Sequence, residues 1–298
     1  MTKTAYDGAE GGTGRRWLVT GGAGFIGSNL CRFLLDRGGT VTAIDNFFTG
    51  KREHVARLEK HGEGRFRFVE GTILDADTIR AAAQGCEHVI HLAAQVSVQR
   101  SIDNPAETHE INTTGFLNVL DATHDAGAGR LVYASSCAVY GDNPHLPLAE
   151  SGRATPMSPY AATKLANEVY AAGFAGSWRN LGVIGLRFFN IFGAWQDPSG
   201  GYAAVIPKWI DAFLSGDQPV LFGDGSAVRD FCHVDNVCEA IWTACELKHP
   251  INHGVFNIGT GVEMENMTMV EILLDTLGKP RSLIQHVKDR EGHDQVGS

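Results

Sequence analysis

Short apolar runs recur along the first two thirds of the chain. Longer segments follow most of them, and SNLCRFLLDRG after the first run has the composition of an apolar helix. Near-continuous apolar runs are typical of strands buried on both faces of a parallel sheet. Alternation of such strands with helices predicts a doubly wound α/β fold with helices on both faces of the sheet. The expected strands are WLVTGG, TVTAIDN, RFRFVEG, HVIHLAA, RLVYASS and VIGLRFFN.

The alternation ends near residue 190. We expect a loop in AWQDPSGGYAAV, helices in IPKWIDAFLSG and VDNVCEAIWTACEL, a strand and turn in QPVLFGDGSAVRD, and a strand in GVFNIGT. Neither an internal repeat nor a low-complexity linker separates the two halves. The pattern therefore predicts a smaller lobe woven from insertions, with a main domain of residues 16–186 and 226–262 and a lobe of residues 187–225 and 263–298.

Composition narrows the possible functions. The 298 residues carry a net charge of −9, which argues against a nucleic-acid partner because phosphate binding needs a basic face. Apolar runs stay shorter than a membrane span, so we expect no membrane partner. Residues 1–15 are polar and glycine-rich, which indicates a disordered tail and no secretory signal. The six cysteines form no C-x-x-C pair, which favours reduced thiols in a cytoplasmic protein and gives no support for a metal site.

A glycine-rich segment follows the first expected strand. VTGGAGFIGSN spaces Gly21, Gly24 and Gly27 between a strand and a helix, and Asp45 ends the next strand. Glycines let a backbone approach a pyrophosphate at a helix N-terminus, and an acid at this spacing binds the adenosine ribose. A carboxylate would repel the 2′-phosphate of NADP, so the segment predicts NAD and a Rossmann-type domain. The alternative is a simple glycine-rich turn with an aspartate that caps a helix.

The segment SPYAATK carries candidate chemistry. Tyr160 and Lys164 are four residues apart and share one face of a helix that Ser158 caps. To act as a base near pH 7, a tyrosine needs its phenolate favoured by about 3 pKa units, or roughly 4 kcal/mol. A neighbouring lysine and a bound nicotinamide cation are charges that supply such a shift. In isolation the spacing also suits an ordinary amphipathic helix.

Eight ordered motifs give the chain a family resemblance from about residue 16 to 294: VTGGAGFIGSN, AIDN, HLAA, INTTGFLNVLDA, SPYAATK, LRFFNIFG, GDGSAVRDFCHVDN and FNIGTG. The chain resembles the extended short-chain dehydrogenase/reductases of the NAD-dependent epimerase/dehydratase family. The resemblance implies that the main domain binds NAD tightly and that the lobe binds a nucleotide diphosphate sugar. Thr72 stands where the family usually has Asp. Besides Asp45, Tyr160, Lys164 and the three glycines, the implied cofactor residues are Phe25, Ile26, Asn46, Thr49, Gly50, Thr72, Ile73, Leu92, Ala93, Ala94 and Asn112.

The stretch YASSCAVYGD separates the reactions of this family. By position, Ser136 matches the catalytic Ser or Thr that bonds the sugar 4-hydroxyl beside Tyr160. In the sugar 4,6-dehydratases the next two positions hold acids that eliminate water, and the decarboxylases tend to keep the second. Here Cys137 and Ala138 occupy these positions, and neither side chain performs those proton transfers. The resemblance therefore favours reversible oxidation at C4. Cys137 is a small packed residue in this interpretation, with a nucleophile as the alternative.

Within the family the chain is most similar to the UDP-glucose and UDP-N-acetylglucosamine 4-epimerases, and it keeps Phe188 where a Tyr is often found. Small residues near the chain end, and a serine near the expected acetamido group, favour the acetylated sugar. The alternatives are that this serine only caps a loop and that Arg229 forms a structural ion pair with Asp230 or Asp235. The implied substrate residues are Ser97 at the acetamido group, Ser136 at the 4-hydroxyl, Asn190 and Arg229 at the diphosphate, Val205, Lys208 and Trp209 at the uracil, and Arg290 and Asp294 closing over the diphosphate.

The resemblance leaves several alternatives open. A UDP-glucuronate 4-epimerase or a CDP-sugar 2-epimerase would use the same residues, and a catalytically silent NAD-binding regulator is a different class. Relatives continue for a few tens of residues beyond Ser298, so either the chain is a truncated form or its pocket wall is incomplete. Apolar faces on two helices, about residues 105–125 and 160–176, predict a homodimer.

Overall fold

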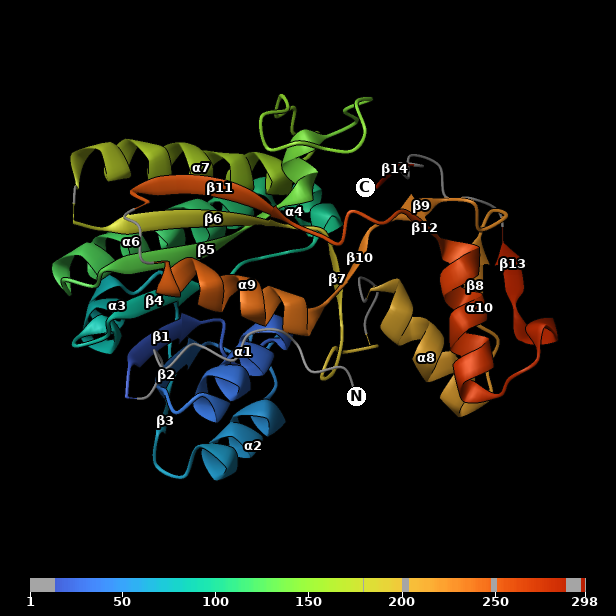
Figure 1. Cartoon of the computed structure of the whole chain (residues 1–298), viewed down its shortest axis with the longest axis horizontal. Helices are drawn as coiled ribbons and strands as arrows, with labels where there is room; N and C mark the ends of the chain where they lie inside the picture. Colours follow the sequence, from blue (N-terminus) through green and yellow to red (C-terminus); the bar gives the residue numbers. More distant parts are fainter. Residues whose placement is uncertain (1–13, 179, 200–203, 248–250, 288–295, 298) are drawn as a thin grey trace.

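The centre of the protein is a seven-stranded parallel sheet (Figure 1). The computed structural model describes residues 14–178, 180–199, 204–247, 251–287 and 296–297. The strand order is β11-β6-β5-β4-β1-β2-β3, and the direction of winding reverses between β1 and β4. This arrangement confirms the predicted α/β fold class. The strands are β1 (Arg16–Thr20), β2 (Thr40–Asp45), β3 (Phe66–Glu70), β4 (His88–His91), β5 (Arg130–Ser136), β6 (Gly182–Phe188) and β11 (His253–Ile258).

Helices cover both faces of the sheet, and each face has its own apolar core. Leu30, Leu34 and Leu58 belong to the core on the first face, and Ile79, Phe116 and Ala171 to the core on the second. Because both faces are buried, strand β1 keeps only Arg16 exposed. The first face carries α1 (Phe25–Asp36), α2 (Arg52–Gly62) and α9 (Val234–Glu246). The second carries α3 (Ala76–Ala83), α6 (Gly115–Asp125) and α7 (Pro159–Ser177).

The helical segment expected at about residues 105–125 is present but is not uniformly α-helical. It contains a π-helical turn, η1 (Glu110–Thr114), between α5 (Pro105–His109) and α6. A π turn inserts one extra residue into a helix and often marks a functional site. The short helix α4 (Val98–Asp103) precedes it, so the whole segment follows the carboxyl end of β4.

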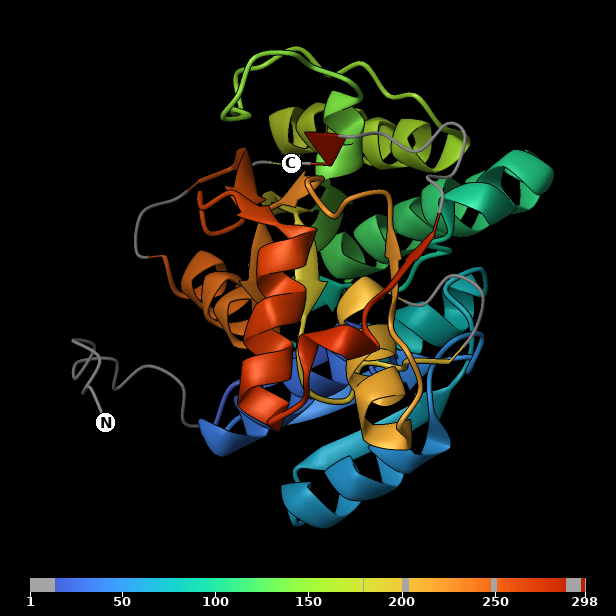
Figure 2. The same ribbon diagram turned by 90° about the vertical axis from the view of Figure 1, so that its right-hand side faces the viewer.

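A smaller lobe lies beyond the carboxyl ends of the sheet strands (Figures 1 and 2). Strand β6 leads into β7 (Asn190–Phe192), which pairs with β10 (Phe231–His233) and so connects the two parts. A separate core that includes Ile206, Phe213 and Leu274 fills the lobe. Its other elements are α8 (Val205–Ser215), β8 (Val220–Phe222), β9 (Val228–Arg229), β12 (Met264–Glu265), α10 (Asn266–Leu277), the 3₁₀ turn η3 (Arg281–Leu283), β13 (Gln285–Val287) and β14 (Val296–Gly297).

Among the described residues, no helix combines the length and the apolar character that crossing a bilayer requires.

Candidate active site

A cavity of about 570 Å³ opens at the carboxyl ends of β1, β2, β4, β5 and β6, where the winding direction reverses. Ligands of doubly wound folds bind at such a switch point. Every residue expected at the cofactor lines this cavity except Gly50 and Asn112. The residues that line it without having been expected are Ile44, Phe48, Gly71, Leu74, Gln95, Val96, Glu107, Ile111, Ala134, Ser135, Phe188, Phe189 and Ile191.

The glycine loop is packed too tightly for side chains. Gly21 has φ +73°, and a Cβ atom there would lie 2.8 Å from the Ala93 backbone nitrogen. A Cβ on Gly27 would lie 2.1 Å from the Gly21 carbonyl oxygen. Glycine is therefore required at both positions for the turn and for the close approach of α1. The N-terminus of α1 consequently points into the cavity with backbone that a pyrophosphate can approach.

Asp45 lies at the end of β2 against this loop. Its Oδ2 accepts a hydrogen bond from the Ala23 backbone nitrogen at 3.1 Å, and its Oδ1 accepts one from that of Phe47 at 2.7 Å. Burial raises the pKa of the carboxyl group, while these backbone donors act in the opposite direction. Gly50 lies behind Asp45, since a Cβ on Gly50 would come within 2.8 Å of Asp45 Oδ1. Asp45 remains in the cavity wall, with acceptor capacity for ribose hydroxyls.

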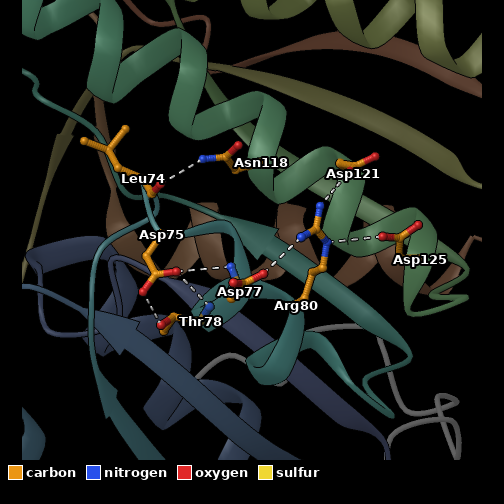
Figure 3. A network of polar contacts seen from close by, with 8 residues as sticks. All are labelled: Leu74, Asp75, Asp77, Thr78, Arg80, Asn118, Asp121 and Asp125. Carbon is orange, nitrogen blue, oxygen red and sulfur yellow. Dashed lines mark hydrogen bonds and ion pairs between the residues drawn. The ribbon is translucent and has the colours of Figure 1, made fainter.

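The loop after β3 forms the other side of this end of the cavity. Asn118 on α6 donates a hydrogen bond to the Leu74 carbonyl at 3.3 Å (Figure 3). It also donates to the Ile73 carbonyl at 3.0 Å. Asp75 caps α3, whose Arg80 bonds Asp121 of α6 at 3.1 Å. The loop that carries Thr72 and Ile73 is therefore fixed from both sides. The family's usual aspartate is absent at Thr72, whose hydroxyl instead accepts from Leu74 N.

Ser136, Tyr160 and Lys164 all reach the opposite end of the cavity. Ser158 caps helix α7 by accepting from Ala161 N at 3.1 Å, and this places Tyr160 in the first turn. The Ser136 side chain acts on the Tyr160 hydroxyl as a hydrogen-bond partner that lowers its pKa. Lys164 donates to the Ala134 carbonyl at 2.9 Å and lies 5.9 Å from the centre of the Tyr160 ring. The three side chains therefore line the same cavity.

The electrostatics of the protein alone run against the expected phenolate. Burial raises the pKa of Tyr160 to about 12, and the hydrogen bond with Ser136 acts in the opposite direction. Burial also lowers the pKa of Lys164 to about 8. The ammonium group of Lys164 is directed at the Ala134 carbonyl. A low-dielectric site of this kind magnifies the effect of a cation bound beside the phenol.

Asn112 stands behind the cavity wall instead of lining it. Its Oδ1 accepts from Gln95 N at 2.8 Å, and its Nδ2 donates to Gln95 O at 2.9 Å and to Thr163 Oγ1 at 3.1 Å. The π turn that holds Asn112 therefore ties the loop after β4 to the helix of Tyr160. Asn112 therefore supports the cavity wall from behind.

The residues expected at the sugar nucleotide are placed less uniformly. Trp209 is 2% exposed in the lobe core and donates to Val220 O at 2.9 Å, so its ring supports the lobe from within. Ser97 caps α4 by accepting from Arg100 N, which is the capping alternative stated above. Asn190 donates to Asp230 O at 3.1 Å, and Arg229 donates to Val228 O at 2.7 Å.

None of these four lines the described cavity, and neither do Val205 and Lys208, which lie half-buried on α8. Asp230, the first proposed partner of Arg229, accepts instead from Thr260 and Gly261 backbone nitrogens, both at 2.8 Å. Arg290 and Asp294 lie outside the described residues.

The cavity residues that sequence reasoning missed fall into two groups. Phe48, Leu74, Gln95 and Val96 are neighbours of residues that it did identify, so adjacency to those motifs was an available signal. Ile111 begins the motif INTTGFLNVLDA and directly precedes Asn112, so the same signal was available for it. Glu107 comes from the helical segment after β4 and belongs to no motif that distinguishes it.

Comparison with known proteins decides the family. The family model described as "NAD dependent epimerase/dehydratase family" matches residues 17–259. A UDP-glucose 4-epimerase of Mycolicibacterium smegmatis is 38% identical over 271 residues, which cover 89% of this chain and 83% of that protein. The chain belongs to the NAD-dependent epimerase/dehydratase family. Its cofactor is NAD, and the described cavity has the glycine cradle and the carboxylate that this cofactor needs.

Solved structures extend the likeness to the whole fold. A UDP-N-acetylglucosamine 4-epimerase from Methanobrevibacter ruminantium M1 is similar with a TM-score of 0.88 and 35% identity, covering 95% of this chain and 88% of that one. The dTDP-glucose 4,6-dehydratase DesIV from Streptomyces venezuelae, solved with NAD bound, has a TM-score of 0.82 and 34% identity, with coverage of 94% and 86%. This chain is thus similar to both epimerases and dehydratases of the family.

Proposed function

We propose that the protein is a nucleotide-sugar 4-epimerase that interconverts UDP-N-acetylglucosamine and UDP-N-acetylgalactosamine, UDP-glucose and UDP-galactose, or both pairs. One observation carries this proposal. Ser136, Tyr160 and Lys164 meet in the cavity, while the two positions after Ser136 hold Cys137 and Ala138. With NAD as the hydride acceptor, oxidation at a carbinol carbon needs no side chain beyond the first three. Elimination needs an acid and a base that these two positions do not provide.

The thiol of Cys137 does not replace the missing acid and base. Burial raises its pKa to about 11, so the thiolate form is scarce at neutral pH. Residues 137–140 form a 3₁₀ turn, η2 (Cys137–Tyr140), whose first backbone nitrogens face Ser136, and Ser136 Oγ accepts from Ala138 N at 3.2 Å. This turn therefore holds the Ser136 side chain in place in the wall of the cavity.

The proposed reaction follows from this arrangement. Tyr160, as phenolate, takes the proton of the sugar 4-hydroxyl while Ser136 holds that hydroxyl in place. NAD, when bound, supplies the acceptor for the C4 hydride and returns it. The 4-keto sugar turns about its diphosphate link, so that the opposite face of C4 receives the returning hydride while Tyr160 gives the proton back to the 4-oxygen. Lys164 positions the nicotinamide ribose and adds positive charge beside the phenol.

Product analysis with three UDP-sugars identifies the sugar substrate. Purified protein should be incubated separately with UDP-glucose, UDP-N-acetylglucosamine and UDP-glucuronate, and the products resolved by NMR. We expect the C4 epimer of at least one of the first two and no 6-deoxy-4-keto product, with Tyr160→Phe as the inactive control. Reaction of UDP-glucuronate alone would assign the related epimerase, and a 6-deoxy-4-keto product would refute the epimerase.

We further propose that the protein acts as a homodimer in the cytoplasm. Val98 and Ile102 of α4 are 45% and 55% exposed, and Val169 and Tyr170 of α7 are 66% and 42% exposed. The α4 and α7 helices that carry these exposed apolar side chains pack against each other. A second copy that pairs through these two helices would cover them. All six cysteines are unpaired, as expected in a reducing compartment.

A further inference from the structure

A buried ion pair lies directly behind the catalytic side chains. Arg187 donates to both carboxylate oxygens of Glu168, from Nε at 2.9 Å and from Nη2 at 2.7 Å, and both side chains are 7% exposed. Glu168 lies one helical turn after Lys164 on α7, and Arg187 directly precedes Phe188 in the cavity wall. A bidentate pair of this kind fixes both the distance and the orientation of the two elements that carry it.

The pair joins the catalytic helix to the strand of Ser136. The Ser135 hydroxyl donates to Glu168 Oε1 at 2.5 Å, and the Lys164 ammonium donates to the Ala134 carbonyl at 2.9 Å. Two successive residues of β5, immediately before Ser136, are therefore bonded to two side chains one turn apart on α7. Together these bonds resist sliding of the helix along the strand, whereas apolar contacts alone would tolerate it.

A second branch reaches the turn that follows Ser136. Arg187 donates to the Tyr140 hydroxyl at 2.7 Å, and that hydroxyl donates to Asn257 Oδ1 at 2.7 Å. Tyr140 ends the turn η2, and Asn257 also donates to the Leu148 carbonyl at 2.8 Å. Arg187 thus contacts, directly or through one residue, each segment that carries or supports a catalytic side chain.

We propose that Glu168 and Arg187 are positioning residues that set the distance between Tyr160 and Ser136. Stability alone does not account for such a pair, because a packed apolar pair of similar volume is often equally or more stable. Catalytic geometry accounts for this pair, because a misplacement of about 1 Å can lower a rate by about 100-fold. The catalytic consequence rests on the function proposed above.

The decisive variant is the double substitution Glu168→Gln with Arg187→Met, which leaves no unpaired charge in the core. We expect it to retain NAD and a thermal midpoint near that of the wild type, while kcat falls about 10- to 100-fold and KM changes less than about threefold. The acid limb of the kcat profile should move to higher pH, because a displaced Tyr160 loses the Ser136 hydrogen bond that favours its phenolate.

Arg130→Met is the matched control. Arg130 is also buried, at the opposite end of β5, and donates to the Ile251 carbonyl at 3.0 Å. Its loss should lower the thermal midpoint and leave kcat and the pH profile unchanged. If the double variant fails to fold, Arg187→Lys keeps the charge but loses the bidentate geometry, and it should shift the same acid limb in the same direction.

A substrate-free titration separates this proposal from the proposed function. The phenol of Tyr160 is followed near 295 nm as the difference between each NAD-bound protein and its Tyr160→Phe counterpart. We expect a higher apparent pKa in the double variant than in the wild type or Arg130→Met. Equal values would overturn the positioning role even if turnover changes. If the wild type converts no UDP-sugar, the proposed function fails and this titration still decides the positioning role.

Discussion

Replacing Asp45 by Asn should weaken NAD binding by about 30- to 150-fold. Two of the roughly four acceptor positions of the carboxylate are used by Ala23 N and Phe47 N, and two remain for the adenosine ribose. A hydrogen bond to a charged group contributes about 1.5–3 kcal/mol, compared with about 0.5–1.5 kcal/mol for a neutral one. Loss of charge at two bonds therefore costs about 2–3 kcal/mol, at about 1.4 kcal/mol for each tenfold change.

The assay is calorimetric titration of cofactor-free protein with NAD and with NADP. The preference for NAD should shrink in Asp45→Asn, since the charge that repels a 2′-phosphate is gone. Asp230→Asn is the matched control, because Asp230 is equally buried and also accepts from backbone nitrogens, but it lies outside the cavity lining. It should lose stability and keep its NAD affinity.

The same titration tests the charge state of Asp45. Burial raises its pKa above that of an ordinary aspartate, so the carboxylate is lost earlier as the pH falls. NAD affinity of the wild type should therefore decrease on acidification from a higher pH than an exposed aspartate would give, and Asp45→Asn should lack this decrease. An NAD affinity within threefold of the wild type in Asp45→Asn, or equal binding of NAD and NADP by the wild type, would refute the reasoning.

Three further outcomes are expected. Tyr160→Phe should retain NAD but lose about 100- to 10,000-fold in kcat, and Ser136→Ala should lose less. Steady-state assays with a quantified NAD content measure both losses, and full activity of Tyr160→Phe would contradict the mechanism. Asn118→Ala removes both bonds to the loop after β3, so urea denaturation should give an unfolding free energy lower by about 1–2 kcal/mol, and no change would dismiss that support. Light scattering should give a molar mass of twice the 32.1 kDa of one chain, and Val169→Glu should reduce that mass to the value of a single chain. A wild-type monomer at micromolar concentration would count against the dimer.

Much of the main domain was predictable because its signals are local. Gly21 and Gly27 indicate a close approach of two backbone segments, and the four-residue spacing of Tyr160 and Lys164 places both on one helix face. Strand order was not predictable in the same way, because an apolar run indicates that a strand is buried but does not indicate which strand lies beside it. The fold class thus follows from pattern, while the neighbours of each strand follow only from the structure.

The supporting contacts were beyond sequence reasoning for a physical reason. Arg187 sits in an apolar strand motif and Glu168 in an ordinary helix, and nothing local indicates that they pair across 19 positions. Trp209 shows the opposite difficulty, because an aromatic residue in the expected substrate segment also suits the interior of the lobe, where the structure places it. Residue type states what a side chain is able to do, whereas burial and partners decide which possibility is realised.

The π turn at residues 110–114 has a consequence for how this chain can change over evolutionary time. The turn takes up one extra residue by widening, so the α-helical turns before and after it keep their faces. Without that widening, one extra residue would rotate everything after it by about 100°. The Asn112 bonds to Gln95 would then be incompatible with the contact of Asp121 to Arg80. Insertions and deletions elsewhere in this segment, where no such turn absorbs them, should consequently be rare in functional descendants, even though the segment contains no residue of the catalytic trio.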